Sequence, residues 1–134
     1  MGDQVDELME GTTTGLRDVI ELKRPSHKVI MFDKDHRSYF FSRDVSVAIG
    51  QCHRYLDVLH LDVGERGLRD HPEVVSYHPQ AVIVIGRSNQ WGTDELRALH
   101  GLNQRLHGIT VVTYDQLLQQ GQRALEVLET EATS

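Results

Sequence analysis

Glu21 and Lys23, two positions apart, are the residues of this chain whose types and spacing best suit chemistry. The segment 19–23 alternates as a β-strand does, so both side chains are expected on the same face of a sheet. A carboxylate beside an ammonium group can hold a metal ion next to a proton acceptor, which is what phosphodiester hydrolysis needs. Taken alone, such a pair is also typical of a solvated, salt-bridged strand face, and the surrounding sequence has to distinguish the two.

A second acid, Asp6, can complete the set of oxygen ligands. Residues 5–9 and 16–23 have strand character, and the glycine- and threonine-rich segment between them predicts the turn of an antiparallel hairpin. This hairpin would bring Asp6 beside the end of the strand that carries Glu21, and two carboxylates suit Mg²⁺. We expect the acidic groups and Lys23 to converge at a solvent-reachable rim of the sheet, outside the core.

Other acids near the hairpin are weaker candidates. Asp18 is at odd spacing from Glu21 and should point to the opposite face. Asp3 and Glu7 remain alternatives to Asp6 if the strand register shifts. A plain exposed strand acid without a ligand role also remains open for Asp6.

A helix is predicted to follow, with Ser42 as its N-cap and Asp44 in its first turn. Gln51 and Tyr55 are four positions apart, so they share a face beside the apolar stripe of this helix. There Gln51 can hydrogen-bond a metal-bound water or hold Lys23. The Tyr55 hydroxyl can donate to a phosphate group, or the ring can pack in the core. The stripe consists of Val45, Ala48, Ile49, Cys52, Leu56 and Leu59.

The order and spacing of these motifs resemble the PD-(D/E)XK nuclease superfamily, in its RecB-like branch. Asp6 stands where the first motif has its acid, although Val5 replaces the usual proline. Glu21-Leu22-Lys23 matches the second motif, and Gln51-Cys-His-Arg-Tyr55 matches the Q-x-x-x-Y motif. Longer phrases resemble the nuclease domain of Shedu, an anti-phage defence family, from about residue 6 to about residue 128. These phrases are residues 21–25, 48–51, 82–87 and 113–117.

The resemblance implies a restriction-endonuclease-like α/β fold, in which a mixed central sheet is flanked by helices. It implies a deoxyribonuclease that depends on Mg²⁺ (or Mn²⁺), an endonuclease in preference to an exonuclease. Lys23 would then position the attacking water or take its proton. The implied catalytic residues are Asp6, Glu21, Lys23, Gln51 and Tyr55, the implied metal ligands are Asp6, Glu21 and the carbonyl of Leu22, and Arg24 joins Tyr55 in contacting DNA.

The segments on either side of the first helix are predicted from weaker signals. Residues 29–32 and 38–41 predict a second, shorter hairpin at the edge of the sheet. Residues 62–79 hold two prolines and several charges and predict a long loop, with a short strand near 74–75.

The last third of the chain predicts a strand–helix–strand unit and a closing helix. Residues 81–86 are continuously apolar, which predicts a strand buried on both faces. A helix from Thr93 that ends at Gly108, followed by a strand over 109–113, completes a right-handed parallel crossover, with helices on both faces of the sheet. The final helix is expected over about 115–128. Its inward side chains should be Leu117, Leu118, Gly121, Leu125 and Leu128.

Size and composition set further limits. At 134 residues the chain predicts a single domain, residues 1–134, with a core of its own. One cysteine, no secretory signal and no apolar run of ~20 residues indicate a cytoplasmic protein. The formal net charge of −6 is unusual for a free-standing DNA binder. We therefore expect this domain to come from a longer, homo-oligomeric protein that supplies much of the DNA affinity, and the domain alone to bind DNA weakly.

An alternative of a different class is a nucleic-acid-binding or assembly module that keeps the fold and cleaves nothing. The acidic net charge and Val5 in the place of the proline favour it. A divalent ion held between Asp6 and Glu21 would favour the enzyme instead.

Overall fold

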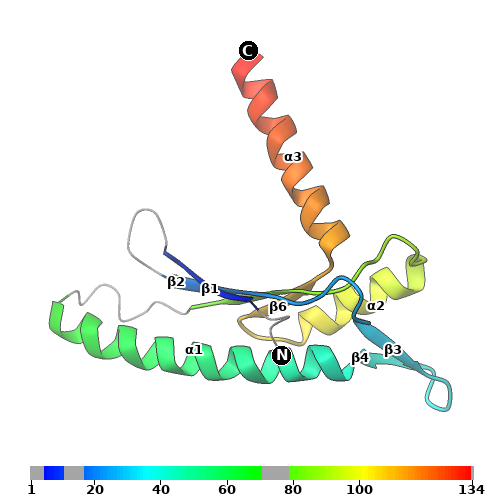
Figure 1. Ribbon diagram of the computed structural model, residues 1–134, viewed down its shortest axis with the longest axis horizontal. Helices are drawn as coiled ribbons and strands as arrows, with labels where there is room; N and C mark the ends of the chain where they lie inside the picture. Colours follow the sequence, from blue (N-terminus) through cyan, green and yellow to red (C-terminus); the bar gives the residue numbers. More distant parts are fainter. Residues whose placement is uncertain (1–4, 11–16, 71–78, 134) are drawn as a thin grey trace.

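The computed structural model describes residues 5–10, 17–70 and 79–133, which form a mixed α/β fold (Figure 1). For residues 5–10, 17, 62–70 and 133 only the backbone is described. The predicted α/β class is confirmed. The elements in chain order are β1 (Val5–Glu10), β2 (Arg17–Leu22), β3 (Ile30–Asp33), β4 (Ser38–Phe41), α1 (Arg43–Asp70), β5 (Ala81–Val84), α2 (Thr93–Gln104), β6 (Ile109–Val112) and α3 (Tyr114–Thr133).

The central sheet has the strand order β1-β2-β5-β6. β1 and β2 form the antiparallel hairpin that the sequence predicted, whereas β2, β5 and β6 run parallel, so the sheet is mixed. Within the hairpin, Asp6 lies opposite Glu21, which agrees with the expectation that the hairpin brings Asp6 beside the end of the strand that carries Glu21. The parallel strands end at one edge of the sheet, where ligands of open α/β sheets usually bind.

One face of this sheet is covered by both α1 and α2 (Figure 1). Ile83 and Val111, paired on neighbouring strands, share one buried cluster with Cys52 of α1 and Leu99 of α2. The prediction of helices that cover both faces is not met, because both crossover helices lie on the same side and α3, on the opposite side, rises away from the sheet (Figure 1). On the other face Val84 is buried and Val82 is half-buried, so β5 is largely buried on both faces, as predicted.

α1 begins where the sequence predicted and ends later. Ser42 Oγ accepts a hydrogen bond from the backbone N–H of Val45 at 3.3 Å, which confirms the N-cap. The predicted apolar stripe is buried or half-buried along its length. The helix continues to Asp70, so a loop starting at residue 62 is wrong. A nucleated helix gains one hydrogen bond for each residue added, and this propagation overrides weak local preferences. The strand expected near 74–75 lies outside the described residues.

β3 and β4 form the second predicted hairpin as a separate two-stranded sheet, and not at the edge of the central sheet. Its inner pair, Ile30 and Phe41, packs against the core. Further out, the rings of Phe32 and Tyr39 are in contact, with centroids 4.9 Å apart. Side-chain packing at its base, instead of a shared strand ladder, therefore holds this hairpin in place.

α2 and β6 complete the predicted crossover, with β5 and β6 as parallel neighbours. The helix ends at Gln104, earlier than expected, and Gly108 lies in the following turn with φ +72°. Asn103 donates from Nδ2 to the carbonyl of Val111 and accepts from its N–H, both at 2.8 Å. Within the described ranges, none of the helices combines the length and apolar character that crossing a membrane requires.

α3 differs most from expectation. It runs from Tyr114 to Thr133 and rises away from the sheet (Figure 1). Leu118 is 64% exposed and Leu125 is 59% exposed, although the sequence predicted both to be buried. Helical spacing shows that one face of a helix is apolar, but it does not identify what covers that face. The other expected inward residues, Leu117, Gly121 and Leu128, are also exposed.

Candidate functional site

Glu21 and Lys23 lie together at the C-terminal end of β2, on the face that α1 covers. Glu21 is 0% exposed and Lys23 is 9% exposed, and Lys23 Nζ lies 3.2 Å from Glu21 Oε1. The expected same-face placement is correct. The expected solvent-reachable rim is wrong for these two side chains, because α1 packs directly over them. They form a buried ion pair.

α1 provides the next two contacts, because its apolar stripe presses this part of the helix onto β2. Gln51 Oε1 accepts a hydrogen bond from Lys23 Nζ at 3.1 Å. Cys52 Sγ donates to Glu21 Oε2 at 3.0 Å. Gln51 therefore lies where the sequence placed it, beside the lysine. Cys52, which the sequence assigned only to the apolar stripe, also contacts the carboxylate.

One oxygen of Glu21 keeps spare acceptor capacity. Oε1 is buried and accepts no hydrogen bond of good geometry from the described residues, although Lys23 Nζ is 3.2 Å away. The ion pair still stabilises the carboxylate, because Coulomb attraction depends on distance and not on donor angle. A buried carboxylate oxygen that lacks a hydrogen-bond donor suits a hard divalent cation.

The other predicted metal ligands are placed by the backbone alone. Asp6 is the register partner of Glu21, but its side chain lies outside the described residues. Leu22 is the last residue of β2 and follows Glu21 directly. Among the side chains that the structure describes, no group of three or more His, Cys, Asp or Glu could hold a metal. Glu21 thus fits one side of a Mg²⁺ site, and the fit of the rest depends on Asp6 and the main chain.

The comparison with protein families covers all of these positions. The sequence model of the family described as Shedu protein SduA, C-terminal, matches residues 4–118. The chain belongs to this family. The matched region includes Asp6, Glu21, Lys23 and Gln51 and ends at Leu118, so most of α3 follows it. No curated protein matches the chain.

In this Shedu domain, the two predicted DNA contacts lie on different elements. Tyr55 is half-buried and packs against the core, and together with Gln51 it lines a hollow of about 440 Å³ along α1. Arg24 is exposed in the loop after β2, and its carbonyl accepts hydrogen bonds from the N–H groups of His27 (3.3 Å) and Gly86 (3.2 Å). The loops that follow β2 and β5 are therefore tied together beside the site.

Tyr114 of the Shedu domain belongs to the site, although the sequence reasoning did not select it. Its hydroxyl donates to the main-chain carbonyl of Lys23. Burial raises the pKa of this phenol above its ordinary value, so the hydroxyl keeps its proton at neutral pH. The first residue of α3 thus fixes the backbone of the candidate catalytic lysine.

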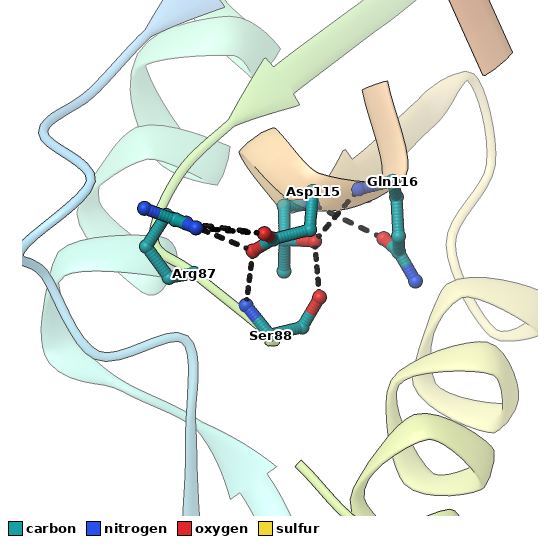
Figure 2. A network of polar contacts seen from close by, with 5 residues as sticks. Arg87, Ser88, Asp115 and Gln116 are labelled. Atoms are coloured by element: carbon teal, nitrogen blue, oxygen red, sulfur yellow. Dashed lines mark hydrogen bonds and ion pairs between the residues drawn. The ribbon is translucent and has the colours of Figure 1, made fainter. Parts of the chain in front are cut away.

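A polar network next to Tyr114 joins α3 to the loop after β5 (Figure 2). Arg87 donates to both carboxylate oxygens of Asp115 at 3.0–3.2 Å, and the backbone N–H of Ser88 donates to the same carboxylate at 2.6 Å. Thr113 and Gln116 exchange side-chain and backbone hydrogen bonds at 3.1 and 3.2 Å, which makes a reciprocal N-terminal cap. α3 is therefore held firmly at its first turn.

The charges of this network support one another. Hydrogen bonds from Arg87, and then from the N–H of Ser88, lower the pKa of Asp115 below its ordinary value. The same carboxylate raises the pKa of Arg87. The sequence held one signal for these residues, since 82–87 and 113–117 were two of the phrases that resemble Shedu. Nothing in their spacing indicated that the two phrases would meet.

Proposed function

We propose that this chain is a metal-dependent DNA nuclease domain of a Shedu-like anti-phage defence protein. One observation carries the proposal. A fully buried carboxylate, Glu21, keeps an acceptor oxygen beside Lys23, on a strand whose partner residue is Asp6. The membership of the Shedu family supports the defence role. DNA is the proposed substrate, Mg²⁺ or Mn²⁺ the proposed cofactor, and internal cleavage is proposed in preference to attack at ends.

The residues of the chain have separate roles in this proposal. Glu21, Asp6 and the carbonyl of Leu22 would hold the ion. When bound, Mg²⁺ polarises the scissile phosphate and makes a bound water more acidic. Lys23 positions the attacking water or accepts its proton. Gln51 and Tyr114 fix the lysine from its two ends, one at the ammonium and the other at the main-chain carbonyl.

Cys52 has a positioning role in this arrangement. Its thiol donates to Oε2 of Glu21, whereas Lys23 pairs with Oε1. Each carboxylate oxygen therefore has its own partner, and these two contacts fix the orientation of the carboxylate before an ion binds. A side chain held in this way loses little further freedom when it binds an ion, which favours affinity.

A plasmid-nicking assay tests the proposal, with Mg²⁺ or Mn²⁺ against EDTA and at low salt. Wild-type protein should nick supercoiled DNA only with the metal. Glu21→Gln removes a ligand and Lys23→Met removes the positioned amine, so each should slow nicking by ~10²-fold or more. Asp94→Asn, an exposed acid of α2, is the matched control and should nick at the wild-type rate.

The alternative function predicts a different result. A module that binds DNA or assembles the protein, with Glu21 and Lys23 as a purely structural ion pair, would nick nothing with any divalent metal. If Glu21→Gln nicks at the wild-type rate, the active site lies elsewhere and the assignment to this pair is wrong.

A further inference from the structure

The basic residues of the chain are concentrated in one stretch. Residues 23–43 hold six lysines and arginines and two aspartates, a formal charge of +4, although the whole chain carries −6. This stretch begins at the candidate catalytic lysine, continues through the β3–β4 hairpin and ends at the first residue of α1. The net charge of the chain therefore conceals a local cationic segment next to the site.

The same hairpin concentrates aromatic side chains. It contains all three phenylalanines of the chain, Phe32, Phe40 and Phe41, together with Tyr39. Phe41 packs on the core, but Phe32 is 48% exposed and Phe40 is 49% exposed. Exposed aromatic rings interleaved with cations are the combination that binds unpaired nucleic-acid strands, because bases stack on rings and phosphates attract cations.

The hairpin is firmly attached between the two elements that build the candidate site. Ser42 Oγ donates to the carbonyl of Lys28 at 2.7 Å, and the Ser42 N–H donates to the carbonyl of Val29 at 2.9 Å. The base of the hairpin is thereby closed where α1 begins. Figure 1 shows the hairpin extending from the body of the domain beside the start of α1.

The turn at the tip of the hairpin is ordered and carries a charge at an unfavourable backbone position. Asp33 Oδ1 accepts hydrogen bonds from the N–H groups of Asp35 (3.0 Å) and His36 (3.4 Å), and Asp33 Oδ2 lies 2.8 Å from His36 Nδ1. Arg37 has φ +50°, a region where glycine or asparagine is usual. An arginine held there at some cost in strain indicates a use for its charge.

We propose that the β3–β4 hairpin is an arm that binds a single-stranded stretch of DNA. Lys28, Lys34 and Arg37 contact phosphates, and Phe40, on the face of the hairpin opposite to Phe32, stacks on a base. This inference rests on the proposed function only in taking DNA as the ligand. It assigns a cationic surface to a chain whose net charge is acidic, on an arm that follows Lys23 directly in the chain.

The test measures binding of a fluorescent 20-nucleotide thymidine oligomer by anisotropy, in EDTA, over a series of salt concentrations. Arg37→Gly removes the charge and suits φ +50°, so the fold should be at least as stable as wild type. Loss of one phosphate contact should weaken binding several-fold and reduce the slope of log affinity against log salt by ~0.7. Phe40→Ala should weaken binding ~5-fold with an unchanged salt slope, because stacking is not ionic.

Two matched controls show whether the effect is local. Arg97→Gly removes an exposed arginine on α2 and Leu61→Ala an exposed apolar side chain on α1, and both should bind as wild type does. The proposal is overturned if Arg37→Gly and Phe40→Ala also bind like wild type, or if Arg97→Gly loses as much. It is equally overturned if a 20-base-pair duplex binds more tightly and Phe40→Ala leaves that binding unchanged.

The same variants separate this inference from the proposed nuclease. If nicking depends on metal but the hairpin variants bind the oligonucleotide as wild type does, the proposed DNA-binding arm is wrong and the proposed nuclease is unaffected. If the hairpin variants bind the oligonucleotide more weakly but the wild-type protein nicks nothing, the proposed nuclease is wrong and the proposed DNA-binding arm is unaffected.

Discussion

Glu21 is a charged side chain removed from water, and its neighbours have to replace the solvent. Transfer of an ion to a protein interior costs several kcal/mol even after relaxation. Lys23 and Cys52 provide the two contacts that the described residues offer, one from the same strand and one from α1. A divalent cation bound at Oε1 would give Glu21 a second cationic partner beside Lys23. Stability and metal binding should therefore be linked at this residue.

A pair of variants tests that link. Lys23→Met leaves Glu21 buried without a counter-charge, so the free energy of unfolding should fall by ~3 kcal/mol, and adding Glu21→Gln should restore most of the loss. In thermal melts, Mn²⁺ should raise the melting temperature of Lys23→Met more than that of wild type, because the cation replaces the lost ammonium. Glu21→Gln alone should gain little. An equal Mn²⁺ shift in Glu21→Gln would place the metal at another site.

At the level of elements, the sequence predicted the contacts between segments that are close together in the chain. The strands of a hairpin are close in the sequence, so the sequence predicted that Asp6 lies beside the end of the strand that carries Glu21, and the structure pairs these two residues. Helical spacing likewise placed Gln51 beside the sheet, and its contact with Lys23 followed. The buried position of the ion pair could not be predicted, because strand alternation defines a face but not the helix that covers it.

The direction of α3 could not be predicted from the sequence, because distant residues determine it. Its apolar stripe was visible in the sequence, but its direction is set by the contacts of Tyr114 and Asp115 with residues 91 and 27–28 positions earlier in the chain. Such long-range hydrogen bonds leave no periodic signal. The hydrogen bonds of Tyr114 and Asp115 at the first turn, which we call the α3 clamp, hold this helix in place, and burial of its leucines does not.

The clamp predicts a pH dependence for the docking of α3. Because the pKa of Asp115 is lowered in the folded state, its stabilising effect is complete above the ordinary aspartate pKa of ~4 and is lost as the pH falls through the folded value. Asp115→Asn should therefore melt below wild type at pH 7, and the difference should shrink as the pH falls below about 4. Arg87→Gln, which removes the clamp from the other side, should behave in the same way. A difference that is constant over this range would contradict the assignment.

At the level of the whole molecule, we expect the exposed face of α3 to associate with a second copy of the chain. Leu118, Gly121, Leu125, Leu128 and Ala132 follow one another at alternating spacings of three and four, which is the seam of a coiled coil. A helix that projects from the body with this seam exposed can pair with its equivalent. We propose that the expected homo-oligomer uses this surface.

Sedimentation velocity over a range of protein concentrations tests this association. Wild type should sediment as an oligomer at tens of micromolar. The double variant Leu118→Gln/Leu125→Gln removes two apolar side chains worth ~1.5–3 kcal/mol each when buried, so the dissociation constant should rise at least 100-fold. Leu61→Gln changes a leucine of α1 that is equally exposed and should have no effect. A wild-type protein that stays monomeric at every concentration would exclude the surface.

The outer edge of β6 bears on whether the protein aggregates at high concentration. A strand at the end of a sheet offers unpaired N–H and carbonyl groups to any other chain that comes near, and this is how sheets grow into fibres. Here the amide of Asn103 takes both main-chain groups of Val111, and Gln116 takes the N–H of Thr113. Two side-chain amides from neighbouring helices thus occupy the main-chain groups of Val111 and the N–H of Thr113, and a further strand could pair with these groups only by displacing the amides.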